Sequence, residues 1–116
     1  MSPDNCLFCR IVRKEIPANI ALETDQVLAF HDLHPQAPTH VLIIPKVHTA
    51  SLDALTAEDA ALAGELLLTV ARVAREARVA DTGYRIVANT GDHAGQSVPH
   101  LHFHVLGGRR LNWPPG

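Results

Sequence analysis

The sequence predicts one small domain in which a long helix covers one face of a β-sheet. Five segments have the apolar patterns of strands, at residues 21–23, 27–32, 39–44, 84–89 and 100–106. Residues 56–79 instead repeat apolar side chains every three or four positions, which is the period of an amphipathic helix. The chain has 116 residues, of which 47% are hydrophobic and 19% charged, and this composition is that of a single globular domain.

The local signals in chain order support each of these elements. A short amphipathic helix is expected near the N-terminus, and it ends before Pro17. The turn at residues 24–26 joins the first two strands into a hairpin. The strand at 39–44 is continuously aliphatic, so we expect it to be buried on both faces. Thr56 is the expected N-cap of the long helix, because acidic residues follow it in the first turn.

The last strand carries a row of imidazoles. Side chains alternate between the two faces of a strand, so His100, His102 and His104 share one face while the apolar residues between them share the other. Three interpretations remain open from this pattern alone. The row can bind a metal ion, it can be the polar front of an apolar strand, or it can provide a neutral imidazole nucleophile with neighbouring donors.

Cys6 and Cys9 form a Cys-x-x-Cys pair near the N-terminus. We expect no disulfide, because the sequence shows no secretory signal. A thioredoxin-like redox pair would follow a strand and precede a long helix, and neither is expected here. The pair is therefore either half of a zinc site, completed by histidines such as His48, or two small buried side chains.

Three further features bear on function. Asp32 ends a strand, where a carboxylate is either solvated or able to accept hydrogen bonds from both hydroxyls of a ribose. His40 begins the aliphatic strand and is either a core histidine satisfied by one backbone bond or a neighbour of the other imidazoles. The loop at residues 91–99 contains two glycines and a hydroxyl directly before the histidines, so its backbone N–H groups can approach an anion such as phosphate.

Composition excludes some classes of partner. The net charge is −2 and no basic block occurs, which argues against nucleic acid or an anionic membrane as the main partner. The longest aliphatic run, at residues 41–44, is far too short to span a bilayer. With no apolar run behind the first residues, we expect no signal peptide and a cytoplasmic protein.

Residues 95–106, with the sequence Gly-Gln-Ser-Val-Pro-His-Leu-His-Phe-His-Val-Leu, resemble the signature of the histidine triad (HIT) superfamily. Other segments, in the same order along nearly the whole chain, resemble its Hint branch of purine nucleoside phosphoramidases. They are Phe30-His31-Asp32, Pro35 to His40, Pro45-Lys46 with His48, Tyr84-Arg85, Asn89, Gly107-Gly108-Arg109 and Trp113-Pro114-Pro115-Gly116.

The resemblance implies an α+β fold over residues 1–116, with a five-stranded antiparallel sheet, one short helix and one long helix. It also implies a homodimer in which two sheets join into one of ten strands. The C-terminal tail, residues 109–116, would reach toward the dimer partner, and Trp113 would approach the partner's site.

The resemblance further implies a hydrolase that cleaves purine nucleoside 5′-phosphoramidates, such as adenosine phosphoramidate or AMP-lysine. His102 would attack the α-phosphorus and form a nucleotidyl-histidine, from which water releases AMP or GMP. The backbone carbonyl of His100 would hold the His102 ring, and His104 and Ser97 would donate to the phosphoryl oxygens. Ser97 and His40 would contact the leaving group, and no cofactor would be needed for catalysis.

Nucleotide-binding residues carry over in the same way. Asp32 would bind the ribose hydroxyls and Asn89 would lie near the ribose and phosphate. The base would enter an apolar slot, and the phosphate would meet the glycine loop and the triad. The residues implied for the slot are Phe8, Ile11, Ile16 and Leu33, and those for the phosphate are Gly95, Gln96, Ser97, His102 and His104.

The Cys-x-x-Cys pair departs from the animal Hint pattern. Related bacterial proteins and the galactose-1-phosphate uridylyltransferase relatives bind structural zinc with such a pair, so the resemblance implies a site made of Cys6, Cys9, His48 and His100. Two other functions stay open, namely hydrolysis of diadenosine polyphosphates, whose branch lacks the Trp-Pro-Pro-Gly ending, and a nucleotide-binding regulatory scaffold.

Overall fold

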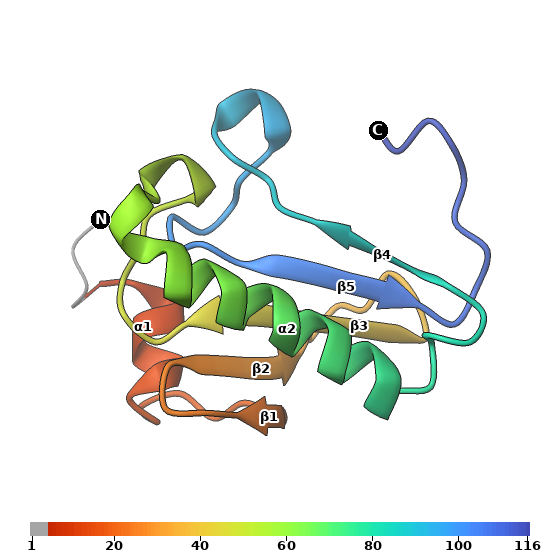
Figure 1. Ribbon diagram of the computed structural model, residues 1–116, viewed down its shortest axis with the longest axis horizontal. Coiled ribbons are helices and arrows are strands. Elements are labelled where there is room, and N and C mark those ends of the chain that lie inside the picture. The colour runs from red at the N-terminus through yellow and green to blue at the C-terminus, as the bar shows by residue number, and fades with distance from the viewer. Residues whose placement is uncertain (1–4) are drawn as a thin grey trace.

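The computed structural model describes residues 5–116, and five strands and two α-helices make up its framework (Figure 1). Three short 3₁₀ turns, Leu52–Ala54, Ala57–Asp59 and Asp92–Ala94, lie in the connections. The framework elements are α1 (Leu7–Val12), β1 (Ile20–Glu23), β2 (Val27–His31), β3 (Thr39–Pro45), α2 (Ala60–Glu76), β4 (Tyr84–Val87) and β5 (Phe103–Gly107). Neither helix is long and apolar enough to cross a bilayer in the part of the chain described.

All five strands form one antiparallel sheet in the order β1-β2-β3-β5-β4, which confirms the predicted α+β fold. The predicted hairpin is present, since β1 pairs with β2 across a turn in which the Thr24 N–H donates to the Val27 carbonyl at 2.9 Å. The central pair is β3 and β5, whose register sets Leu42 opposite His104. In this register His40, near the start of β3, pairs with Leu106 and lies close to His104 of β5.

One face of the sheet packs against α2, which lies across it (Figure 1). The core between them consists of side chains from alternate positions of the strands and from the buried side of the helix: Val27, Ala29, Val41, Ile43, Leu66, Val70, Val73, Leu101, Phe103 and Val105. The apolar residues between the three histidines therefore face this core, as the alternating pattern predicted.

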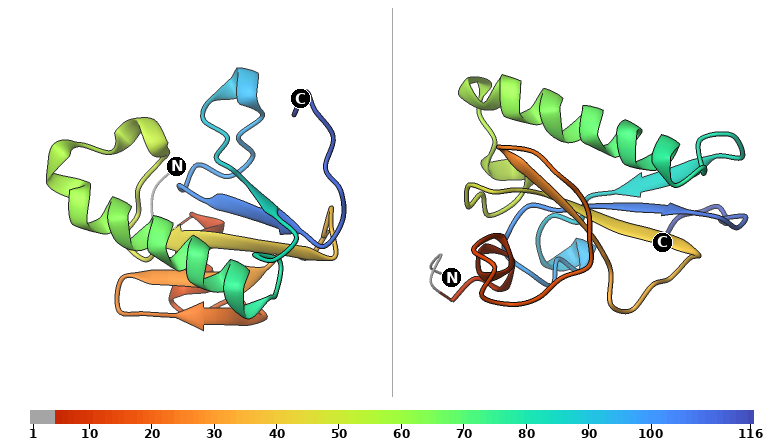
Figure 2. Two further views of the ribbon diagram at one scale, coloured as in Figure 1. Left: turned by 45° about the vertical axis from the view of Figure 1, so that its right-hand side comes forward. Right: turned by 90° about the horizontal axis from the view of Figure 1, so that it is seen from below.

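Part of the opposite face of the sheet is covered by α1, which lies on the other side of the sheet from α2 (Figure 2). The intervening positions of the same strands pack here, namely Leu28, Phe30, Leu42 and Ile44, together with Cys6, Phe8, Cys9 and Ile11. Strand β3 is thus buried on both faces, as expected from its aliphatic run.

Several element boundaries differ from the sequence predictions. The histidine strand begins at Phe103 rather than at residue 100, because the N–H groups of His100 and Leu101 donate to the carbonyls of Val98 and Thr49 instead of to a strand. Thr56 caps a 3₁₀ turn with a capping box, and α2 itself begins at Ala60.

Helix α1 ends at Val12, before Pro17 as predicted, and Lys14 beyond it has a φ of 64°. Helix α2 and another strand are shorter than predicted. Helix α2 ends at Glu76 instead of residue 79, and Arg78 beyond its end has a φ of 61°. Left-handed residues of this kind stop a right-handed helix. Strand β4 ends at Val87 rather than at residue 89.

Candidate active site and metal centre

A cavity of about 290 Å³ lies on the α1 side of the sheet, next to the histidines. Helix α1 and the segment after it supply one wall, the end of β2 and the following loop supply another, and the histidine strand supplies the floor. The lining residues are Leu7, Phe8, Ile11, Ile16, Pro17, Ala18, Phe30, His31, Asp32, Leu33, His34, Leu42, Ser97, Val98, His102 and His104. The resemblance implied twelve nucleotide-binding residues, and eight of them line this one cavity: Phe8, Ile11, Ile16, Asp32, Leu33, Ser97, His102 and His104.

His102 is buried and its tautomer is fixed by the backbone. Its Nδ1 lies 2.7 Å from the carbonyl oxygen of His100, and because a carbonyl only accepts, Nδ1 carries the proton. In the neutral ring Nε2 then keeps its lone pair. The ring packs edge-on against Phe8 and against His104, with centroid distances of 5.1 Å in both cases. A neutral imidazole held in this way is a nucleophile with a defined direction.

A second imidazole chain sets the tautomer of His104. The Gln36 N–H donates to His40 Nδ1 at 3.0 Å, so the proton of His40 must lie on Nε2. His40 Nε2 is 2.9 Å from His104 Nδ1 and donates to it. His104 therefore carries its proton on Nε2. We call this chain from Gln36 through His40 to His104 the histidine relay, and its outcome is a triad histidine that is a hydrogen-bond donor.

The relay is consistent with the electrostatics of the two rings. Burial, together with the neighbouring His102 and His40, lowers the pKa of His104 to about 4 against the opposing effect of Asp32. Burial also lowers the pKa of His40, against the opposing effect of Asp32. Both rings are therefore neutral at physiological pH, as the relay requires.

Asp32 lies at the cavity wall with its side chain 19% exposed. Its Oδ1 accepts from the His34 N–H at 2.7 Å, which holds the carboxylate in place, and Oδ2 lies 3.5 Å from His40 Nε2. Donor atoms of Asp32, His40 and His104 lie within 4.8 Å of one another, a spacing that also suits a metal ion. The relay argues against one here, because Gln36 occupies the Nδ1 lone pair of His40 and its Nε2 must keep the proton.

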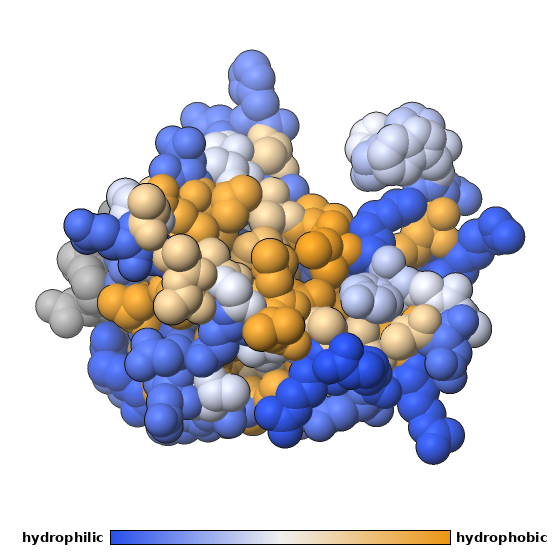
Figure 3. All heavy atoms as spheres, viewed as in Figure 1, coloured by the Kyte–Doolittle hydropathy of each residue, from blue (hydrophilic) through white to orange (hydrophobic). Residues whose placement is uncertain are grey.

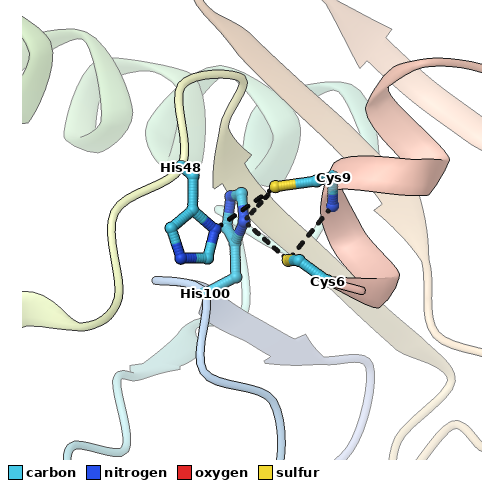
Figure 4. Close-up of side chains that lie close together, drawn as sticks. All are labelled: Cys6, Cys9, His48 and His100. Atoms are coloured by element: carbon cyan, nitrogen blue, oxygen red, sulfur yellow. Dashed lines mark hydrogen bonds between the residues drawn. The ribbon is translucent and has the colours of Figure 1, made fainter. Parts of the chain in front are cut away.

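Cys6, Cys9, His48 and His100 form a candidate zinc site, which we call the tetrad; Figure 4 shows that their side chains converge. Their donor atoms all lie within 4.8 Å of one another. Cys6 Sγ is 3.3 Å from His100 Nδ1, and Cys9 Sγ is 3.2 Å from His48 Nδ1. Two thiols and two imidazoles are a common donor set of structural zinc.

Two details of the tetrad fit a metal. His100 Nε2 donates to the Pro45 carbonyl at 2.8 Å, so the unprotonated Nδ1 faces the sulfurs with a lone pair available for ligation. Burial, reinforced by Cys6, raises the pKa of the Cys9 thiol to about 11, so the Cys9 sulfur becomes a thiolate only if a positive charge joins it. The Cys-x-x-Cys pair, the loop after β3 and the first triad histidine thus meet as the resemblance implied.

The loop before the histidines is braced by Gln96 rather than by its glycines alone. Gln96 Oε1 accepts from the Gly91 N–H at 3.0 Å, and Nε2 donates to the carbonyls of Ala50 and Val98 at 2.8 and 3.1 Å. Gly95 has a φ of 75°, a left-handed conformation that glycine adopts without strain. Gln96 and Gly95 therefore shape the loop that presents Ser97 to the cavity, and neither lines the cavity itself.

Two other residues implied by the resemblance lie apart from the cavity. Asn89 is not among its lining residues, and Trp113 is 80% exposed on the C-terminal tail, with Arg85 stacked 5.9 Å from its ring. Residues that the sequence analysis did not assign complete the lining: Leu7, Pro17, Ala18, Phe30, His31, His34, Leu42 and Val98. The apolar members could have been inferred from their position beside assigned residues. His31 belongs to a segment that carries the resemblance but was given no role, and His34 carried no distinguishing signal.

A larger cavity of about 510 Å³ lies between the start of β4 and the C-terminal tail. Its lining is Thr82, Gly83, Tyr84, Arg85, Gly108, Arg109, Arg110 and Leu111. Two of its arginines donate to backbone carbonyls, Arg85 to Asn112 and Arg109 to Gln36. These contacts hold the tail, and the lining offers none of the nucleophiles or bases found in the smaller cavity.

Comparison with known proteins agrees with the geometry. The HIT domain family matches residues 13–111. An uncharacterized HIT-like protein of Synechococcus elongatus is 54% identical over 116 residues, which is the full length of both chains. A 14 kDa zinc-binding protein of Zea mays is 47% identical over 112 residues, covering 95% of this chain and 87% of its own.

Solved structures give the same result. A HIT family hydrolase from Legionella pneumophila superposes with a TM-score of 0.95 at 46% identity, covering 97% of this chain and 100% of its own. The matched family region includes the relay, the triad and two tetrad residues, His48 and His100. The chain belongs to the HIT domain family.

Proposed function

We propose that this protein is a nucleotide hydrolase of the Hint type, which cleaves purine nucleoside 5′-phosphoramidates to the nucleoside monophosphate and an amine. The observation that carries the proposal is His102, whose Nδ1–H is held by the His100 carbonyl while its ring borders the cavity. The similarity to a HIT family hydrolase of Legionella pneumophila supports the hydrolytic class.

The cavity provides three kinds of contact for a nucleotide. The apolar side chains Phe8, Ile11, Ile16 and Leu33 form a slot for a purine ring. The Asp32 carboxylate accepts hydrogen bonds from the ribose hydroxyls. The α-phosphate then lies beside Ser97 and the triad, where the N–H of His104 Nε2 is available as a donor.

In the first step, the Nε2 lone pair of His102 attacks the α-phosphorus and forms an N–P bond. The bond from phosphorus to the amine nitrogen breaks, its electron pair goes to that nitrogen, and the proton of the Ser97 hydroxyl passes to the nitrogen to give the neutral amine. Negative charge on the phosphoryl oxygens is stabilised by the His104 Nε2–H and by Ser97. The product on the protein is a nucleotidyl-histidine.

In the second step, water attacks the same phosphorus and the His102 N–P bond breaks. His102 recovers its lone pair, the nucleoside monophosphate leaves, and the water proton restores the Ser97 hydroxyl. The chain's contribution is positioning and preorganised donors, and each donor that is lost is expected to cost about 3 kcal/mol in barrier height. Zinc in the tetrad would be structural, since its four ligands do not include the nucleophile His102.

We also propose that the active form is a homodimer. Strand β4 is at the edge of the sheet, so a second copy can pair with it and extend the sheet to ten strands. Apolar side chains gather over the adjoining face around α2 (Figure 3), where Leu68 is 71% exposed and Ile86 of β4 is 41% exposed. Light scattering should give the mass of a dimer, and Leu68→Lys should shift it toward the monomer. A monomeric wild-type protein would contradict this part of the proposal.

The activity is tested by assaying adenosine phosphoramidate and a diadenosine polyphosphate side by side. We expect AMP release from the first substrate to be faster and to be lost in His102→Ala. His93→Ala, which removes an exposed histidine outside the cavity, is the matched control. Preference for the polyphosphate would assign the protein to the other hydrolytic class, and binding of AMP with no turnover of either substrate would support a scaffold role.

A further inference from the structure

Helix α1 is a six-residue element with two functional sides. A helix this short is unstable by itself, so its place depends on what anchors it. Cys6 caps its N-terminus and Cys9 lies in its first turns, and both sulfurs belong to the tetrad (Figure 4). Phe8 and Ile11, on the same helix, line the cavity. One short helix therefore joins the tetrad to the wall of the nucleotide pocket.

Two direct contacts connect the tetrad with His102. The ring of His100 belongs to the tetrad, while its backbone carbonyl accepts the Nδ1–H of His102. Phe8 lies between the two cysteines in the sequence. Its ring packs edge-on against His100 and His102, with centroid distances of 5.9 and 5.1 Å. A change in the position of α1 or of His100 would therefore directly alter the contacts that hold the His102 ring.

We propose that zinc in the tetrad and a purine nucleotide in the cavity bind cooperatively, with Phe8 as the positioning residue that transmits the coupling. This inference rests on the proposed nucleotide site and adds the regulation of that site by metal occupancy. In the tetrad, the cysteine sulfurs lie 3.2 to 3.5 Å from the Nδ1 atoms of His48 and His100. Metal–ligand bonds anchor α1 far more firmly than S···N hydrogen bonds do, so the apolar slot is ordered before the nucleotide arrives.

Thermodynamic linkage makes the coupling reciprocal. If zinc orders Phe8 and Ile11 for the nucleotide, then the nucleotide, by packing on the same side chains, must raise the affinity for zinc by the same factor. The proposal therefore predicts two equal ratios from two independent titrations. We expect each to be about tenfold, within the usual range of such couplings.

The experiment measures the Kd of AMP by calorimetry for the zinc-loaded protein and for the protein stripped with a chelator. The affinity for zinc is measured by competition with a chromophoric chelator, with and without saturating AMP. Tenfold weaker AMP binding after stripping, matched by tenfold weaker zinc binding without AMP, supports the proposal. Equal AMP affinities in the two states overturn it and leave the proposed function intact, whereas no AMP binding in either state overturns both.

Variants on α1 test whether Phe8 carries the coupling. Phe8→Leu keeps an apolar side chain and should bring the two ratios close to one. Arg10→Ala is the matched control, because Arg10 is exposed on the same helix and pairs with Glu15 at 3.6 Å, away from the cavity. It should leave both ratios unchanged. Circular dichroism of the stripped protein shows whether it is still folded. Loss of the sheet signal would mean that weaker AMP binding results from global unfolding, and this would overturn the proposal.

Discussion

His104 is expected to stay neutral far below the pH at which an ordinary histidine ionises. Protonation of its unprotonated nitrogen, Nδ1, would place an N–H directly opposite the Nε2–H of His40. His40 cannot switch to its other tautomer, because the Gln36 N–H donates to its Nδ1. Burial acts in the same direction, and with the neighbouring His102 and His40 it lowers the pKa of His104 from 6.5 to about 4. The relay and desolvation thus both disfavour the charged ring.

The shift has a calculable consequence for folding. A pKa difference of about 2.5 corresponds to about 3.5 kcal/mol, at roughly 1.4 kcal/mol for each tenfold change, and the partial exposure of the ring reduces this figure. The unfolded chain protonates this histidine below pH 6.5 and the folded chain only near pH 4. The free energy of unfolding is therefore unaffected by His104 above pH 6.5 and decreases as the pH falls from 6.5 to 4.

Nitrogen-detected NMR of the imidazole rings measures both the tautomer and the titration midpoint of His104. We expect the Nε2–H tautomer at neutral pH and a midpoint near 4. Asp32→Asn should lower the midpoint further, because the Asp32 carboxylate raises the pKa of both His104 and His40. A midpoint between 6 and 7, or a His104 protonated on Nδ1 at neutral pH, would refute the relay.

Three further predictions concern packing and the loop. Gly107→Ala should lower the free energy of unfolding, measured by thermal denaturation, by about 1–3 kcal/mol, because the added Cβ would lie 2.8 Å from the Cβ of Val79. The loss of stability should be smaller in a Val79→Gly background, and an equal loss there would contradict this explanation. Gln96→Ala removes the brace of the loop and should raise KM severalfold, while Gln26→Ala in an exposed turn should not; equal kinetics for both would contradict the bracing role. His104→Asn should lower kcat on the order of a hundredfold with little change in the folded structure, and full retained activity would remove its role as donor.

The alternation of histidines and apolar residues was sufficient to predict which side chains share a face. Strand periodicity is a local property, and Phe103 and Val105 face the α2 core as expected. The start of that strand was not predictable from the pattern, because it depends on which partner the backbone finds. The N–H of Leu101 donates to Thr49, which lies 52 positions earlier in the chain, and no local signal indicates that bond.

The same limit applies to the candidate site. The Cys-x-x-Cys spacing predicted half of a metal site that histidines such as His48 could complete, but only the family resemblance selected His48 together with His100. Neither the motif spacing nor the resemblance predicted the histidine relay, because it depends on the register of β3 against β5 and on a backbone N–H from the loop before β3. His40 had been left open between a core residue and a site residue, and the structure makes it both buried and bonded to His104.

The central claim is that the Nε2 atom of His102 forms a covalent bond with phosphorus. The most direct measurement is mass spectrometry of the protein quenched within the first turnovers of adenosine phosphoramidate, followed by mapping of the modified residue. We predict one adenylyl group per active site, located on His102 and absent from His102→Ala. Rapid turnover with no adenylylated protein at any quench time, or an adenylyl group on another residue, would contradict the account.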